Sequence, residues 1–271
     1  MLLSLLLLPG LIGTNPSYAN VHEHINHKIS DLKTKTIQVV IVNAPGKINA
    51  NKTETIRLQL LKDNKPLTLN DLKTVHTKKI HIMVIDSTLT DYYHIHPVAD
   101  SKNKDFVFNF TPKKSGTYQI WVDITPSATD KQIFIKSDIG HSSQKAQVNK
   151  EEKLNAHAGS YQFDLKPGGK VQAGKPVMAI ITVTKDGKSF NKLEPVMGAF
   201  AHVVGFNADC SSIMHIHPMG KEPANDSERG GSQLMLHLEP QHAGFVKLFA
   251  QFRINGKDIY VPFGIFVNKK S

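Results

Sequence analysis

The stretch IHIMVIDSTLTDYYHIHP, residues 80–97, decides the fold, because it consists of two short apolar segments joined by the polar turn STLTD. β-Branched and aromatic residues on both sides of such a turn are typical of a β-hairpin. The pattern returns without a gap at residues 201–218, as AHVVGFNADCSSIMHIHP. The copies correspond at one constant offset: His81, His94, His96 and Pro97 become His202, His215, His217 and Pro218. A hairpin repeated at this distance indicates two homologous domains.

The rest of the chain continues the β pattern on both sides of the hairpins. TIQVVIV, TIRLQLL, FVFNF and TYQIWVDI in the first half, and VMAIITVT, QLMLHL, FVKLFAQF and YVPFGIFV in the second, are short apolar runs separated by Gly, Pro, Asn and Asp. No long segment has the period of 3.6 residues that an amphipathic helix requires. The sequence therefore predicts an all-β chain of two tandem β-sandwich domains.

A leader and a polar linker delimit these domains. Residues 1–12 are almost all Leu or Ile, too few for a membrane span of about 20 residues, and Ser17-Tyr18-Ala19 is a small-x-small cleavage site. We predict a signal peptide (1–19), a histidine-containing N-terminal segment (20–36), a first sandwich (37–137), a linker (138–158) and a second sandwich (159–271). The expected location is the periplasm or the exterior, with no membrane span after signal cleavage.

Composition excludes several classes of protein. Hydrophobic residues make up 40% and charged residues 21%, unlike a disordered chain or a polytopic membrane protein. The net charge is +10, but the lysines are scattered and the only arginines are Arg57, Arg229 and Arg253, so we expect no nucleic-acid partner. The single cysteine, Cys210, excludes an internal disulfide and a four-cysteine zinc site. No hydrolase or phosphate-loop motif is present.

Histidine is the unusual residue, with 14 in the chain. Residues i and i+2 of a strand share a face, so His94 and His96 project together. Opposed side chains of a hairpin lie about 5 Å apart and diagonal ones about 7–8 Å apart, which brings His81 within reach of both. The second copy repeats this with His202, His215 and His217. We predict one metal site in each domain, the alternative being a hydrogen-bonded histidine cluster that stabilises the hairpin.

A fourth ligand precedes each hairpin by five residues. It is His76 in the first domain and Met197 in the second. Imidazole suits copper, zinc and nickel, whereas a thioether biases a site toward Cu(I). The first site is therefore expected to accept Cu(II) or Zn(II), and the second to favour Cu(I).

A further chelate is expected at the mature N-terminus. Cleavage after Ala19 exposes Asn20-Val21-His22, whose amine, two backbone amides and imidazole can hold Cu(II) in a square plane.

The paired H…HxHP motif, with MGAFAHVVGFNADCSSIMHIHP in the second half, resembles bacterial secreted copper- or heavy-metal-binding proteins. The likeness covers residues 38–136 and 161–268 and includes the closing DIYVPFGIFV. It implies Ig-like or cupredoxin-like sandwiches and a role in periplasmic copper handling, with a copper exporter or acceptor protein as partner. The ligands it implies are Met197, His202, His215 and His217; the first domain departs from the pattern by having His76 in place of the methionine.

We therefore expect a non-enzymatic protein that sequesters or delivers copper, with zinc as the alternative metal. A cupin-like metalloenzyme is the second interpretation, because Glu222 follows His215-x-His217 at the cupin spacing. Asp209 stands where a cupin has glycine, which argues against it. A third interpretation is a scaffold or interaction module that binds no metal. Cys210 lies in the hairpin turn, where blue-copper chemistry cannot use it.

Overall fold

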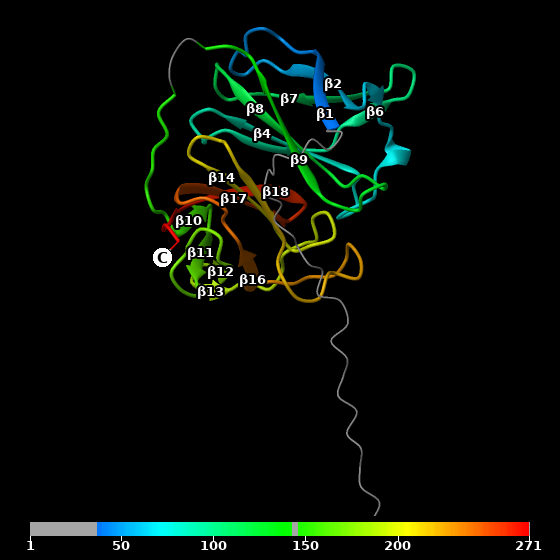
Figure 1. Cartoon of the computed structure of the whole chain (residues 1–271). Coiled ribbons are helices and arrows are strands. Elements are labelled where there is room, and N and C mark those ends of the chain that lie inside the picture. Colours follow the sequence, from blue (N-terminus) through cyan, green and yellow to red (C-terminus); the bar gives the residue numbers. More distant parts are fainter. Residues whose placement is uncertain (1–36, 143–145, 271) are drawn as a thin grey trace, which may run out of the picture.

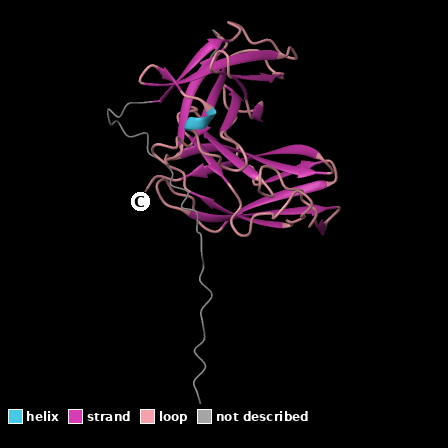
Figure 2. Ribbon diagram, turned by 90° about the vertical axis from the view of Figure 1, so that its right-hand side faces the viewer, coloured by secondary structure: helices cyan, strands magenta, loops and turns pink. Residues whose placement is uncertain are grey.

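A computed structural model describes residues 37–142 and 146–270 (Figure 1). The predicted signal peptide and the N-terminal chelate of Asn20, Val21 and His22 lie outside the described residues. Strands dominate the described part, whose helical content is the single 3₁₀ turn η1 (Leu69–Asp71), drawn in cyan in Figure 2. No helix in this part is long and apolar enough to cross a membrane.

The first domain is a sandwich of two sheets. Its strands are β1 (Ile37–Asn43), β2 (Glu54–Lys62), β3 (Lys65–Pro66), β4 (Ile80–Asp86), β5 (Tyr92–Ile95), β6 (Val98–Asp100), β7 (Asp105–Phe110), β8 (Tyr118–Ile124) and β9 (Ile133–Ile139). One sheet has the order β1-β2-β7-β6, with β3 paired to β2, and the other has the order β5-β4-β8-β9. Apolar residues at alternate positions of β2 and β4, such as Leu58 and Ile82, are fully buried between them.

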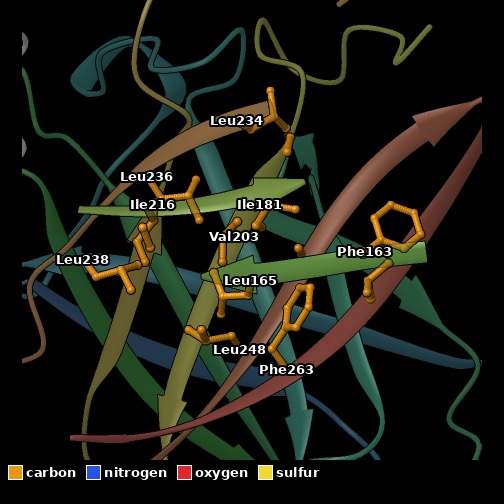
Figure 3. Packing of buried hydrophobic residues seen from close by; sticks show 14 of the residues in the cluster. Phe163, Leu165, Ile181, Val203, Ile216, Leu234, Leu236, Leu238, Leu248 and Phe263 are labelled. Carbon is orange, nitrogen blue, oxygen red and sulfur yellow. The ribbon is translucent and has the colours of Figure 1, made fainter. Parts of the chain in front are cut away.

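The second domain repeats this architecture. Its strands are β10 (Asn155–Ala158), β11 (Tyr161–Pro167), β12 (Val177–Lys185), β13 (Lys188–Ser189), β14 (His202–Asn207), β15 (Ile213–Ile216), β16 (Gln233–Leu238), β17 (Gly244–Ile254) and β18 (Lys257–Val267). One sheet has the order β10-β11-β12-β13, with β16 paired to β12, and the other has the order β15-β14-β17-β18. Figure 3 shows Phe163 and Leu165 of the first sheet packed against Leu248 and Phe263 of the second. The predicted all-β fold of two tandem sandwiches is confirmed.

Equivalent turns carry the signature of the duplication. Asp63 and Asn64 join β2 to β3 with φ of 52° and 61°, and Asp186 and Gly187 join β12 to β13 with φ of 49° and 75°. A two-residue hairpin of type I′ requires positive φ at both central residues, which Asp, Asn and Gly tolerate best. The sequence similarity of KDNK and KDGK thus reflects a shared backbone requirement.

The sheet β5-β4-β8-β9 and the sheet β15-β14-β17-β18 pack against each other, so the two domains share an interface (Figure 1). All residues of β4 and β8 are buried, since one face of each strand lies in the sandwich core and the other lies in this interface. We call the shared apolar group the interface cluster; it comprises Met83, Ile85, Leu89, Tyr92, Trp121, Val204, Phe206, Cys210 and Phe249.

The interface cluster is close to twofold symmetric in composition. Leu89 and Cys210 occupy equivalent turns, with φ of 57° and 52°, and both are buried there. Trp121 and Phe249 likewise occupy equivalent positions on β8 and β17. Cys210 is thus a packing residue of the interface rather than an incidental turn residue, and burial raises the pKa of its thiol to about 12.

Candidate metal centre

The first hairpin brings three histidines together in the way its sequence predicts. Ile82 pairs with Ile95 and Met83 with His94, so His81 lies opposite His96 and diagonal to His94. The Nδ1 atom of His81 lies 3.2 Å from Nε2 of His94 and 3.2 Å from Nε2 of His96. One ring nitrogen from each residue lies within 4.8 Å of the other two. We call this group the first triad.

The second hairpin builds an equivalent group. Val203 pairs with Ile216 and Val204 with His215, which places His202 opposite His217 and diagonal to His215. The Nδ1 atom of His202 lies 3.5 Å from Nε2 of His215. These three residues, the second triad, also offer ring nitrogens within 4.8 Å of one another, and all three are buried. Each domain therefore has a group of histidines that could hold a metal ion.

Backbone carbonyls fix the tautomer of the first histidine of each triad. His81 donates from Nε2 to the oxygen of Val75 at 3.0 Å, and His202 donates from Nε2 to the oxygen of Val196 at 2.9 Å. Since a carbonyl oxygen only accepts, the proton of each neutral ring resides on Nε2. The lone pair of Nδ1 then faces the other histidines of its triad.

The middle histidine of each triad is oriented by the other domain. His94 donates from Nδ1 to Oε1 of Gln251 at 3.1 Å, and His215 donates from Nδ1 to Oδ2 of Asp123 at 2.7 Å. The orientation of the Gln251 amide is fixed, because its Nε2 donates to Asp258 at 3.1 Å. In both histidines the Nε2 lone pair therefore faces its own triad.

These tautomers make the short contacts within the triads unusual. Nδ1 of His81 and Nε2 of His94 both carry lone pairs at 3.2 Å, so no hydrogen bond joins them and the contact is repulsive without a cation between them. A tetrahedral ion with metal–nitrogen bonds of about 2.0–2.1 Å places its ligand nitrogens about 3.3–3.4 Å apart. The observed 3.2 and 3.5 Å lie close to that value. The spacing of these nitrogens thus fits a bound cation. In the metal-free protein the group that can donate a hydrogen bond to Nδ1 of His81 is Nε2 of His96, also 3.2 Å away.

Burial keeps four of the triad histidines neutral and ready to act as ligands. Desolvation, followed by repulsion from His215, lowers the pKa of His81 to about 4. Desolvation, followed by repulsion from His81, lowers the pKa of His96 to about 3. The same burial holds the pKa values of His94 and His202 well below the ordinary value. At neutral pH a metal ion therefore competes with few protons for these nitrogens.

The two triads lie next to each other across the domain interface. Ring centroids are 5.6 Å apart for His81 and His215, 5.8 Å for His94 and His202, and 5.5 Å for His94 and His215. The first two contacts are exchanged by the symmetry that relates the domains, and the third is its own equivalent. The sequence predicted one site in each domain and left open whether the two are independent. The structure places them side by side as one paired centre.

His76 lies against the triad of the other domain rather than its own. It occupies a turn with positive φ (47°), and its ring stacks on His217 at a centroid distance of 3.5 Å and an angle of 16°. It also contacts His202 edge-on at 5.8 Å. The expected grouping of His76 with His81, His94 and His96 therefore differs from the observed one, because the interface packs this turn across the domain boundary.

Met197 occupies the equivalent turn of the second domain. Its φ is 51° and it is half-buried. A Cβ on the neighbouring Gly198 would lie 3.6 Å from the methyl group of Thr77, so the two turns face each other across the interface. By the symmetry that places His76, we expect Met197 to lie on the side of the first triad.

Asp123 and Gln251 are site residues that the sequence analysis missed. They occupy the same position of TYQIWVDI and FVKLFAQF, as polar residues flanked on both sides by apolar ones. Both are buried, at 3% and 4% exposure. A polar residue between apolar neighbours at the same place in both repeats was the signal that could have identified them.

A family model described as a domain of unknown function, DUF8832, matches residues 35–138 and again residues 156–269. No curated protein matches the chain at a significant level.

Some solved structures show a distant likeness. Escherichia coli alpha-2-macroglobulin activated by porcine elastase aligns at 10% identity and a TM-score of 0.27, over 88% of this chain and 22% of that one. Salmonella alpha-2-macroglobulin reacted with methylamine aligns at 10% identity and 0.26, over 87% and 16%. Domains 4 and 5 of the S-layer protein SbsC align at 13% identity and 0.21, over 87% and 98%. The chain thus spans less than a quarter of either macroglobulin, and likenesses this weak carry no functional argument.

Proposed function

The chain belongs to the DUF8832 family and contains two copies of its domain. We propose that it is a secreted or periplasmic protein that binds one metal ion in each triad. The metal we propose is copper, with zinc as the alternative, and the role is sequestration or delivery. The observation that carries this proposal is the convergence of lone pairs, since His81 and His94 present unprotonated nitrogens to each other at 3.2 Å.

Copper is supported by the chemistry of the donor set. Imidazole nitrogens bind copper more strongly than zinc in the usual order of divalent affinities. The half-buried thioether of Met197 in the facing turn would further favour Cu(I). The leader-like residues 1–19 support export, which places the protein where copper is handled outside the cytoplasm.

Sequestration or delivery is favoured over catalysis by the depth of the centre. Five of the six triad histidines are buried, and only His96 is half-exposed. A metal held this way is protected from water and from substrates. An acceptor protein or exporter that exchanges the ion would therefore approach the centre from the side of His96. Glu222, which suggested a cupin-like enzyme, is exposed in the loop after the second hairpin.

Metal analysis of the exported protein tests the proposal. Wild type should carry one equivalent of copper or zinc per triad after growth with the metal. The double variant His81→Ala/His202→Ala should lose both equivalents, because each substitution removes the lone pair at the centre of its triad. The matched control His141→Ala/His157→Ala changes two exposed histidines, one after β9 and one on β10, and should keep both.

Far-UV circular dichroism would verify that each variant is folded. Equal metal content in the double variant and the control would refute the proposal and leave the scaffold interpretation. Titration with Zn(II) rather than Cu(II) limits interference from the N-terminal chelate proposed at Asn20-Val21-His22. Mass spectrometry of the exported protein tests that chelate separately, since a first residue other than Asn20 eliminates it.

A further inference from the structure

We propose that Asp123 of the first domain makes the second triad the site that a divalent ion fills first, and leaves the first triad as the site better suited to a monovalent ion. This inference rests on the proposed function. It concerns a difference between two otherwise equivalent sites.

Asp123 is held in place to act on the second triad. It pairs with His81 across β8 and β4, yet its Oδ2 accepts a hydrogen bond from Nδ1 of His215 in the other domain at 2.7 Å. Gln132 donates from Nε2 to both carboxylate oxygens at 2.9 Å. The side chains of His215 and Asp123 are only 1% and 4% exposed. The carboxylate therefore lies in a medium that screens its charge poorly.

Gln251 occupies the equivalent position and offers a neutral partner. It pairs with His202 across β17 and β14, and its Oε1 accepts from Nδ1 of His94 at 3.1 Å. The nearest carboxylate behind it, Asp258, is already paired with Arg253 at 2.6 Å. The first triad thus receives orientation from the second domain through a neutral amide. The carboxylate of Asp123 also acts on His81 through space, but its hydrogen bond goes to His215 of the second triad.

A second difference acts in the same direction. Lys78 follows the turn of His76, and its positive charge repels positive charge at His81 and His96 in the first triad. The equivalent residue in the second domain is Ala199, which is uncharged. A cation at the first triad therefore faces a nearby like charge that a cation at the second triad does not meet.

Elementary electrostatics turns these differences into selectivity. A carboxylate bound to the far nitrogen of a ligating histidine raises the basicity of that ligand, and losing such a partner typically lowers metal affinity by about 10–100-fold. The Coulomb attraction of the carboxylate is twice as large for a doubly charged ion as for a singly charged one. A buried carboxylate also costs free energy unless a positive charge compensates it, which an ion on His215 would provide. The second triad should therefore prefer Zn(II) or Cu(II), contrary to the expectation from Met197 in the sequence.

The test measures each site in the full-length chain with the other site disabled. His96→Gln leaves the second triad intact, and His217→Gln leaves the first. Into each background we place Asp123→Asn and the reciprocal change Gln251→Glu, both of which keep the side-chain shape. Zn(II) and Cu(I) affinities are measured by competition with coloured chelators of known affinity, and thermal unfolding verifies that the variants fold.

Asp123→Asn should weaken Zn(II) binding by the second triad about 10–100-fold and weaken Cu(I) binding less. It should weaken Zn(II) binding by the first triad by a smaller factor, because His81 feels the carboxylate through space and not through a hydrogen bond. Gln251→Glu should strengthen Zn(II) binding by the first triad, so the proposal stays testable if Asp123→Asn folds poorly. Equal losses at both triads, or unchanged ratios of Zn(II) to Cu(I) affinity, would overturn the inference while leaving the proposed function intact. If wild type binds neither ion, both proposals fall.

Discussion

Removing the ring of Phe249 should weaken metal binding although this residue contacts no proposed ligand. Phe249 is 5% exposed in the interface cluster, and its ring stacks on Tyr92 of the other domain at 4.7 Å and 21°. Truncating a buried Phe to Ala costs about 3–5 kcal/mol. Because the ring faces the interface, most of this free energy is lost from domain docking rather than from folding of either sandwich.

The metal sites depend on docking, since His94 and His215 are each oriented by a residue of the other domain. A loss of about 3 kcal/mol corresponds to a factor of about 150 in the docking equilibrium. If the docked form is no longer dominant, apparent metal affinity falls in proportion to its population. We therefore expect Phe249→Ala to weaken Zn(II) binding by between about 10-fold and 100-fold, and to split thermal unfolding into two transitions.

Phe252→Ala is the matched control, because it removes the same ring from the same strand. Phe252 is fully buried but faces the core of the second sandwich, where it packs on Phe163 at 4.8 Å. It should lower the unfolding temperature of the second domain comparably and leave Zn(II) affinity within about threefold at 20 °C, where the protein is folded. Differential scanning calorimetry and chelator competition provide both readouts. Wild-type affinity in Phe249→Ala, or equal losses in the two variants, would refute the dependence of the sites on docking.

Three further predictions follow from the centre and its surroundings. The metal-free protein should lose stability as pH falls from about 6.5 toward 4. The pKa values of His81 and His96 are lowered to about 4 and about 3 in the folded chain, so in this pH range the unfolded chain binds protons that the folded chain does not. Urea midpoints at pH 7.5 and 5 measure this, and equal midpoints would contradict it. Cys210 is 4% exposed and its pKa is raised to about 12, so it should react with a thiol reagent at pH 8 only after unfolding; fast labelling of the native protein would contradict its burial. Met197→Ala should weaken Cu(I) binding by the first triad and not by the second, as measured in the two single-site backgrounds His217→Gln and His96→Gln. Weaker Cu(I) binding by the second triad alone would show instead that Met197 acts on the site of its own domain.

The hairpins and their histidine triads could be predicted from sequence because both rest on local rules. The alternation of side chains in a strand fixes that His94 and His96 share a face, and the short turn fixes that His81 lies opposite. Similarly, KDNK and KDGK predict tight turns because their backbone requirement is local. Because the hairpin is duplicated, both copies support each of these inferences.

The joining of the two sites could not be derived from the same rules. Strand alternation describes which face a side chain occupies, not what covers that face. A hint was present, since IHIMVID and YQIWVDI have few polar residues, as strands covered on both faces do. His76 was grouped with its own domain because it is close in sequence, but contacts made across an interface do not follow sequence distance.

The symmetry of the interface relates the paired centre on one chain to a dimer of single domains. An isologous surface, in which residue i meets j while j meets i, is one that a single sandwich can form with its own copy. Fusing the two copies replaces a bimolecular encounter with an intramolecular one at an effective concentration in the millimolar range. A homodimer of one-domain chains would come apart on dilution, and its two halves would be identical. The tandem arrangement resists dilution and allows each half to diverge.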